Sequence, residues 1–165
     1  MILGFKELAS VCAAIWAGNQ AILLRKAGLR ESTADSVFAA RSFYLLPTQY
    51  HEKKKAGAAA GFPISLHVHV IQSGDLLDWP DIEKLLPLTA YDPKTIREHF
   101  DSREEKLLHF AHIRASRLDP VWQLASSPSM SGCRSWFELP PAPAGLKETP
   151  VPETEITRQT ARLLS

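Results

Sequence analysis

The chain has 165 residues, 45% of them hydrophobic and 22% charged, a balance typical of one globular domain with a buried core. The formal net charge of +1 excludes attraction of the whole molecule to a polyanion, so any contact with nucleic acid depends on a local basic patch. The only two cysteines, Cys12 and Cys133, exclude a disulfide scaffold and lack the Cys-x-x-Cys spacing of zinc and redox sites.

The first residues, MILGFKELASVCAAIWAG, form an apolar stretch that Lys6 and Glu7 interrupt and that no basic leader precedes. This pattern is unlike a secretory signal. No window of the sequence approaches the roughly twenty apolar residues of a membrane-spanning helix. We therefore expect a cytoplasmic protein with no membrane partner.

The first part of the chain predicts one helix and two strands. Apolar residues at helical spacing predict a helix over residues 3–17, with Gly18 at the position that commonly ends one. Strands are expected over residues 20–26 and 43–46, and Pro47 should end the second because proline has no amide proton. Loops are expected at residues 27–40 and 53–63.

Residues 64–71 alternate between apolar and polar side chains, which predicts a strand. Leu66 and Val68 should face one side of it, and His67 and His69 the other.

Two helices and a further strand are expected next. The segment PDIEKLLPL (80–88) predicts the first helix. DPKTIREHF (92–100) predicts the second, with Asp92 as its cap and Pro93 at its first helical position. Residues 106–118 favour a strand over a helix because their apolar residues do not build a full helical stripe.

The composition changes after residue 139, where prolines alternate with small and charged residues. We expect a single globular domain over residues 1–139 and an extended proline-rich tail over 140–165. The last residues could form one or two helical turns that dock on the body or on a partner. The irregular alternation of helices and strands predicts an α+β (or α/β) fold, a mixed sheet with packed helices.

Three stretches together resemble an uncharacterised bacterial family, domain of unknown function 1802. They are AILLRKAGLRE (21–31), FYLLPTQYHE (43–52) and GCRSWFEL (132–139). The resemblance covers about residues 3–139. It implies no assigned activity, but some family members are joined to, or encoded near, restriction-endonuclease-like domains of the Mrr type. The resemblance therefore implies a connection with nucleic acid or genome defence.

Basic residues occur at the ends of the first two predicted strands and in the loops beside them: Arg25, Lys26, Arg30, Arg41, Lys53, Lys54 and Lys55. If these strands are neighbours, as consecutive strands usually are, the cations converge on one rim and could contact phosphate oxygens. Tyr44, Tyr50 and Trp136 could add stacking on a single-stranded ligand. The alternative is a set of ordinary solvated strand ends.

Two catalytic arrangements are conceivable. Glu52 and Lys54 have the acid-x-lysine spacing of metal-dependent restriction nucleases, with Asp35 as a possible first carboxylate. Cys133 could be a nucleophile with His51 as its base. The alternative for Cys133 is a small core residue after a turn, next to a buried Trp136.

The neighbour of Cys133, Arg134, could help lower the pKa of the thiol. Arg134 and Ser135 would also suit a phosphate or carboxylate ligand.

His67 and His69 could offer a metal two imidazoles, and His109 or His112 could add a third. No carboxylate follows them at a short, fixed interval. We therefore predict no metal site and no cofactor.

The leading hypothesis is an accessory nucleic-acid-associated domain, possibly of a restriction or defence system. Its predicted rim consists of Arg25, Lys26, Arg30, His51, Lys53 and Arg134. The first alternative is a small metal-dependent nuclease or a cysteine/histidine hydrolase that uses His51, Glu52 and Cys133. The second is a protein-interaction module whose tail docks on a nuclease or another protein. The sequence leaves open whether the protein is an enzyme.

Overall fold

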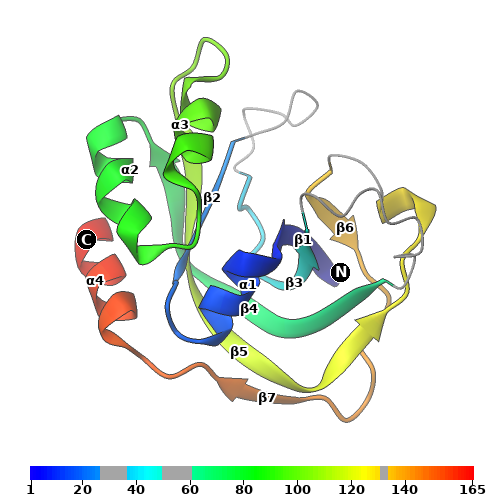
Figure 1. Ribbon diagram of the computed structural model, residues 1–165. Helices are drawn as coiled ribbons and strands as arrows, with labels where there is room; N and C mark the ends of the chain where they lie inside the picture. The colour runs from blue at the N-terminus through cyan, green and yellow to red at the C-terminus, as the bar shows by residue number, and fades with distance from the viewer. Residues whose placement is uncertain (27–36, 50–60, 131–133) are drawn as a thin grey trace.

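A curved mixed β-sheet forms the body of the protein (Figure 1). The structure is a computed structural model, and it describes residues 1–26, 37–49, 61–130 and 134–165. The seven strands of this part are β1 (Leu3–Leu8), β2 (Ile22–Arg25), β3 (Ser42–Thr48), β4 (Phe62–Leu76), β5 (Leu108–Leu124), β6 (Trp136–Glu138) and β7 (Lys147–Pro150). They lie in the order β2-β5-β4-β3-β1-β6, and β7 pairs with β5. β1 and β3 are parallel, and the other pairs are antiparallel.

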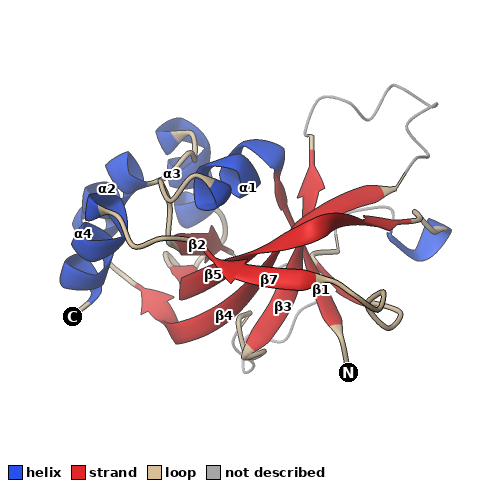
Figure 2. Ribbon diagram, turned by 90° about the horizontal axis from the view of Figure 1, so that it is seen from below, coloured by secondary structure: helices blue, strands red, loops and turns tan. Residues whose placement is uncertain are grey.

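The α-helices of the described part lie together on one side of the strands (Figure 2). They are α1 (Ala9–Trp16), α2 (Trp79–Leu85), α3 (Pro93–Asp101) and α4 (Glu155–Leu164), with short 3-10 helices at η2 (Leu86–Leu88) and η3 (Pro128–Met130). The predicted α+β fold, a single domain with a mixed sheet and packed helices, is confirmed. Within the described ranges, no helix is both long and apolar enough to cross a membrane.

The long strand β4 confirms the predicted alternation of side chains. Leu66 and Val68 are buried in the core, while His67 and His69 are more exposed and lie on the other face. The predicted cap of α3 is confirmed too, because the Asp92 side chain accepts a hydrogen bond from the Thr95 amide at 3.2 Å.

The helix predicted over residues 3–17 is wrong for residues 3–8, which form β1. Phe5, Leu8 and Cys12 are spaced as on one face of a helix, although β1 ends and α1 begins between Leu8 and Ala9. This spacing is the reason that the sequence predicts one long helix. Phe5 and Glu7 are both buried, which is the period of a strand. The correction matters because it places a carboxylate inside the protein.

Pro47 does not end β3, which continues to Thr48 with Pro47 opposite Glu7 of β1. β4 pairs only with Ser42–Tyr44 of β3, so Pro47 has a partner strand on one side, a position where proline is tolerated. The expectation that β2 and β3 are neighbours is also wrong, because β5 and β4 lie between them. The basic residues at the ends of β2 and β3 therefore do not share one sheet edge.

The C-terminal residues pack on the body of the protein. β7 pairs with Ser116–Asp119 of β5, and α4 lies against α2. Thr154 caps α4, accepting a hydrogen bond from the Thr157 amide at 3.2 Å, and its hydroxyl donates to the Gly18 carbonyl at 2.6 Å. The extended tail predicted over residues 140–165 is therefore not confirmed, and the predicted alternative of a short helix docked on the body is observed. The domain boundary at residue 139 stays a prediction.

We expect Thr154→Ala to lower the free energy of unfolding by about 1–2 kcal/mol, because it removes the cap of α4 and the bond to Gly18. Urea unfolding followed by circular dichroism measures this change. Thr149→Ala, at an exposed position of β7, is the matched control and should have a smaller effect. Equal stability of the wild type and Thr154→Ala would show that the cap does not hold the C-terminal segment.

Candidate functional site

A cluster of side chains joins the two ends of the curved sheet. β2 is the first strand in the sheet order and β6 the last. Arg25, the last residue of β2, donates hydrogen bonds to the Lys6 carbonyl at 3.0 Å and to Ser135 Oγ, just before β6, at 3.2 Å. We call Glu7, Arg25, Tyr91 and Ser135 the seam, because their side chains connect edges that no described backbone ladder connects.

Glu7 is the buried anion of the seam, with a side chain that is only 2% exposed. Its Oε1 accepts a hydrogen bond from the Leu8 amide at 2.8 Å. Its Oε2 accepts from the Tyr91 hydroxyl at 2.8 Å and from Arg25 Nη2 at 3.3 Å. These donors compensate for the cost of removing a carboxylate from water.

Tyr91 connects Glu7 to the edge of β2. Its hydroxyl donates to Glu7 and accepts a hydrogen bond from the Leu24 amide at 3.1 Å. Without this acceptor, the amide of an edge strand would be buried and unpaired. Burial, followed by the charge of Glu7, raises the pKa of Tyr91 well above 10.0, so the phenol remains a donor.

Arg25 is the cation of the seam, and it reaches solvent. Its Cζ lies 4.6 Å from the centroid of the Phe5 ring, and its side chain is 28% exposed. The guanidinium carries five N–H donors. Within the described part of the chain, the bonds to Lys6, Glu7 and Ser135 use three of them and leave two without an acceptor.

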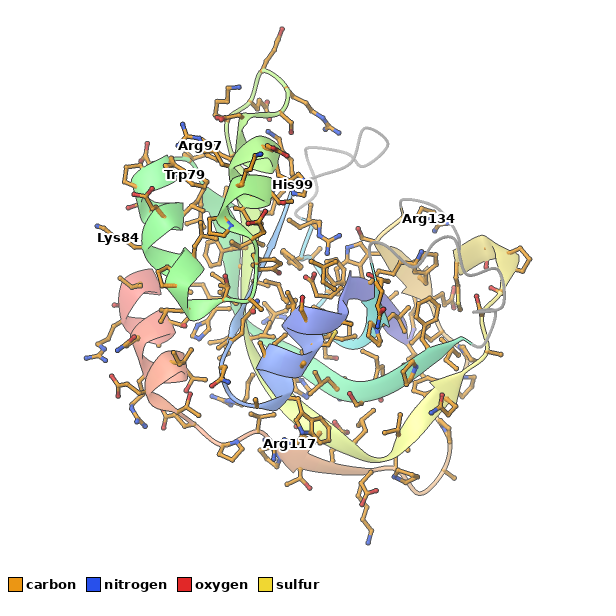
Figure 3. The ribbon with its side chains drawn as sticks, viewed as in Figure 1. Trp79, Lys84, Arg97, His99, Arg117 and Arg134 are labelled. Atoms are coloured by element: carbon orange, nitrogen blue, oxygen red, sulfur yellow. The ribbon has the colours of Figure 1, made fainter. Side chains whose placement is uncertain are left out.

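Arg134 and His99 border the seam. Arg134 directly precedes Ser135 and is exposed, with its Cζ 5.5 Å from the centroid of the Phe137 ring. Desolvation of its partly covered ring, followed by the charge of Arg25, lowers the pKa of the exposed His99 from 6.5, which favours the neutral imidazole. Figure 3 shows both residues at the same end of the molecule, His99 on α3 and Arg134 just before β6.

Lys26 holds the end of α3. Its Nζ donates to the carbonyls of Phe100 at 3.1 Å, Glu105 at 2.6 Å and Ser102. These bonds use the three N–H donors of an ammonium group. Lys26 therefore contributes its positive charge to this surface, while its N–H groups are occupied by backbone carbonyls of the protein.

Several predicted site residues lie outside the described part of the chain: Arg30, Asp35, His51, Glu52, Lys53, Lys54, Lys55 and Cys133. Their proposed roles in catalysis or binding, and with them the nuclease and hydrolase alternatives, stay predictions. Of the predicted nucleic-acid-binding residues in the described part, Arg25 bonds to Ser135, Arg134 directly precedes that serine in the chain, and Lys26 bonds to the end of α3; their role in binding stays a prediction.

Sequence reasoning missed Glu7 and Tyr91. For Glu7, the available signal was a charged residue in the apolar run MILGFKEL, which becomes inward-facing once residues 3–8 are read as a strand. For Tyr91 no local pattern existed, because its partners lie 67 and 84 positions away in the chain.

The described aromatic residues predicted to stack on bases are engaged with the protein. Tyr44 stacks on the ring of His67 with centroids 4.3 Å apart. The rings of Trp136 and Phe5 pack against each other with their centroids 4.7 Å apart. Tyr50 lies outside the described residues. Neither Tyr44 nor Trp136 therefore forms a free stacking platform.

Cys12 lies behind Glu7, with its Sγ 4.0 Å from the Glu7 carbonyl. Burial, followed by the charge of Glu7, raises the pKa of the Cys12 thiol from 9.0 to about 12. The thiol is thus protonated at neutral pH and is a poor nucleophile.

Residues 4–162 match the model of a family described as Domain of unknown function (DUF1802). No curated protein matches the chain. Among solved structures, the chain is similar to the crystal structure of ASCH from Zymomonas mobilis, at 10% identity and a TM-score of 0.49, over 98% of this chain and 94% of that one. A mutant of the same protein gives 8% identity and a TM-score of 0.50 over the same shares. At this identity, the similarity concerns the fold alone.

We expect Tyr91→Phe to lower the free energy of unfolding by about 1–3 kcal/mol, because the Leu24 amide loses its buried acceptor. The variant should also change the response to alkaline pH. The phenol of the unfolded chain ionises near pH 10.0, whereas the pKa of the folded state is higher. The stability from Tyr91 is thus complete below pH 10.0 and is lost as the pH rises through the pKa of the folded state.

Urea unfolding at pH values on either side of 10.0 measures this response. The alkaline loss of stability should be steeper in the wild type than in Tyr91→Phe. Identical slopes in the two proteins would contradict the buried, protonated state of Tyr91.

Proposed function

The chain belongs to the DUF1802 family, and we propose that it binds the phosphate backbone of nucleic acids at the seam. The observation that carries the proposal is the hydrogen bond from Arg25 to a serine that directly follows a second, exposed arginine. Arg25 bonds to Ser135, which is 110 positions further along, and Arg134 directly precedes that serine. Fork-shaped guanidinium groups are well suited to phosphate oxygens.

Arg25 is held in place before any ligand arrives. Glu7 pairs with one side of its guanidinium, and the Phe5 ring packs against it. An immobilised side chain loses little conformational entropy when it binds, which favours affinity. Its two remaining donors and the exposed Arg134 can then contact phosphate oxygens, which position a nucleic acid without reading its sequence.

Further cations extend this surface toward the end of α3. Burial is the largest cause that lowers the pKa of Lys26, and the charges of Lys106 and Arg103 add to it. Glu105 and Asp101 act in the opposite direction and partly offset them. The resulting positive potential is local, in keeping with the net charge of +1 for the whole chain.

A finer part of the proposal is a role beside a nuclease of a restriction or defence system. The support for it is the resemblance to a family in which some members accompany such nucleases. An accessory domain of this kind should bind nucleic acid and leave it intact, and gel electrophoresis of the substrate after prolonged incubation with magnesium checks this. Cleavage that requires the wild-type chain would instead favour the nuclease alternative.

We expect the full chain to bind short RNA and DNA with an affinity that falls as the salt concentration rises. Fluorescence anisotropy with labelled single-stranded RNA, single-stranded DNA and duplex DNA measures this affinity. Arg134→Gln should weaken binding by a similar factor for every sequence, and the salt slope on single strands should fall by about 0.7, the value for one lost phosphate contact.

Lys84→Gln is the matched control, since it removes the same charge from an exposed position of α2 that lies away from Arg134 in Figure 3. It should leave binding nearly unchanged. No binding at low salt, or equal weakening by Arg134→Gln and Lys84→Gln, would refute the proposed surface.

A further inference from the structure

A cluster of potential metal ligands forms on another part of the protein. Within the described residues, His67, His69 and Glu148 each offer one ligand atom, and these atoms lie within 4.8 Å of one another. His67 Nδ1 and Glu148 Oε1 are already 2.7 Å apart. The centroids of the two imidazole rings are 4.7 Å apart.

The sheet explains why these groups meet. His67 and His69 are two positions apart on β4, so both project from the same face. Glu148 comes from β7, which lies across β5 from β4, and His67 is opposite Ser116 of β5. Glu148 is opposite Leu118, two residues after Ser116 on β5, so its side chain projects from the same face as His67.

The position of His67 is fixed by its surroundings, and His69 follows two residues later on the same strand. The ring of Tyr44 stacks on His67 with an interplanar angle of 14°. Leu66 and Val68, the neighbours of His67 in the chain, are buried in the core on the other face of β4. Rigid supporting elements hold ligands near the geometry that a metal requires.

We infer that His67, His69 and Glu148 form a binding site for a divalent transition metal of the zinc class. Two imidazoles and one carboxylate form a known zinc ligand set, and a water molecule takes the fourth position of the tetrahedron. Imidazole nitrogens disfavour Mg²⁺ and Ca²⁺, which prefer oxygen ligands. The sequence prediction of no metal failed to consider Glu148, because this carboxylate lies 81 positions after His67.

Metal binding would fasten the C-terminal segment to the sheet, because Glu148 belongs to β7 and the histidines to β4. The inference is independent of the nucleic-acid proposal. Arg117, which pairs with Thr149 of β7, lies at the opposite end of the molecule from Arg134 in Figure 3. The two sites can therefore be tested separately.

Isothermal titration of the metal-free full chain with Zn²⁺ tests the site. We expect one Zn²⁺ per chain, a rise in melting temperature with Zn²⁺, and no comparable rise with Mg²⁺. With Co²⁺ as the probe, the visible absorption spectrum should show tetrahedral coordination. His69→Gln and Glu148→Gln should each weaken Zn²⁺ binding more than about tenfold, since the loss of a supporting residue alone costs that much.

His99→Gln and Glu104→Gln are matched controls, because they change an exposed histidine and an exposed carboxylate outside the cluster. They should bind Zn²⁺ like the wild type. Circular dichroism of each metal-free variant verifies that it is folded, and both ligand positions are exposed, so each variant should fold. Failure of the wild type to bind Zn²⁺, or equal affinity in the wild type, His69→Gln and Glu148→Gln, would overturn the inference.

Discussion

The pairing of Arg25 with Glu7 is the interaction on which the proposed functional surface depends. The sheet curves until β2, its first strand, approaches β1 and β6 at the other end, and Arg25 makes the connection through Lys6 and Ser135. The buried carboxylate of Glu7 accepts a hydrogen bond from the same guanidinium. Because Glu7 is almost completely buried, loss of Arg25 would leave its carboxylate without a counter-ion, and breaking a buried ion pair in this way typically costs about 3–5 kcal/mol.

This arrangement explains how a chain with a net charge of only +1 can present a basic surface. The anion of the pair is buried, so only the cationic side of the seam reaches solvent, beside the exposed Arg134. Tyr91 completes the seam by pairing the Leu24 amide at the edge of β2. The histidine–glutamate cluster belongs to a separate part of the sheet, where β7 holds the C-terminal segment.

Local patterns in the sequence predicted those elements whose signals are complete within a few residues. The alternation around His67 and His69 and the cap at Asp92 are of this kind. The predictions failed where contacts between segments that are distant in the chain determine the structure. The apolar spacing that continues from β1 into α1 predicts a helix at Glu7. The residues that decide its role are Arg25 of β2 and Tyr91, just before α3, and both are distant in the chain. The proline-rich surroundings of Glu148 predict an extended tail and give no sign that this segment pairs with β5.

The role of the Arg25–Glu7 pair is tested most directly by a double-mutant cycle. Glu7→Gln, Arg25→Gln and the combined variant are compared with the wild type by urea unfolding. We predict a favourable coupling energy of about 1–3 kcal/mol, and a larger loss of stability for Arg25→Gln than for Glu7→Gln. Effects of the two substitutions that add to within about 0.5 kcal/mol would contradict the central role of the Arg25–Glu7 pair.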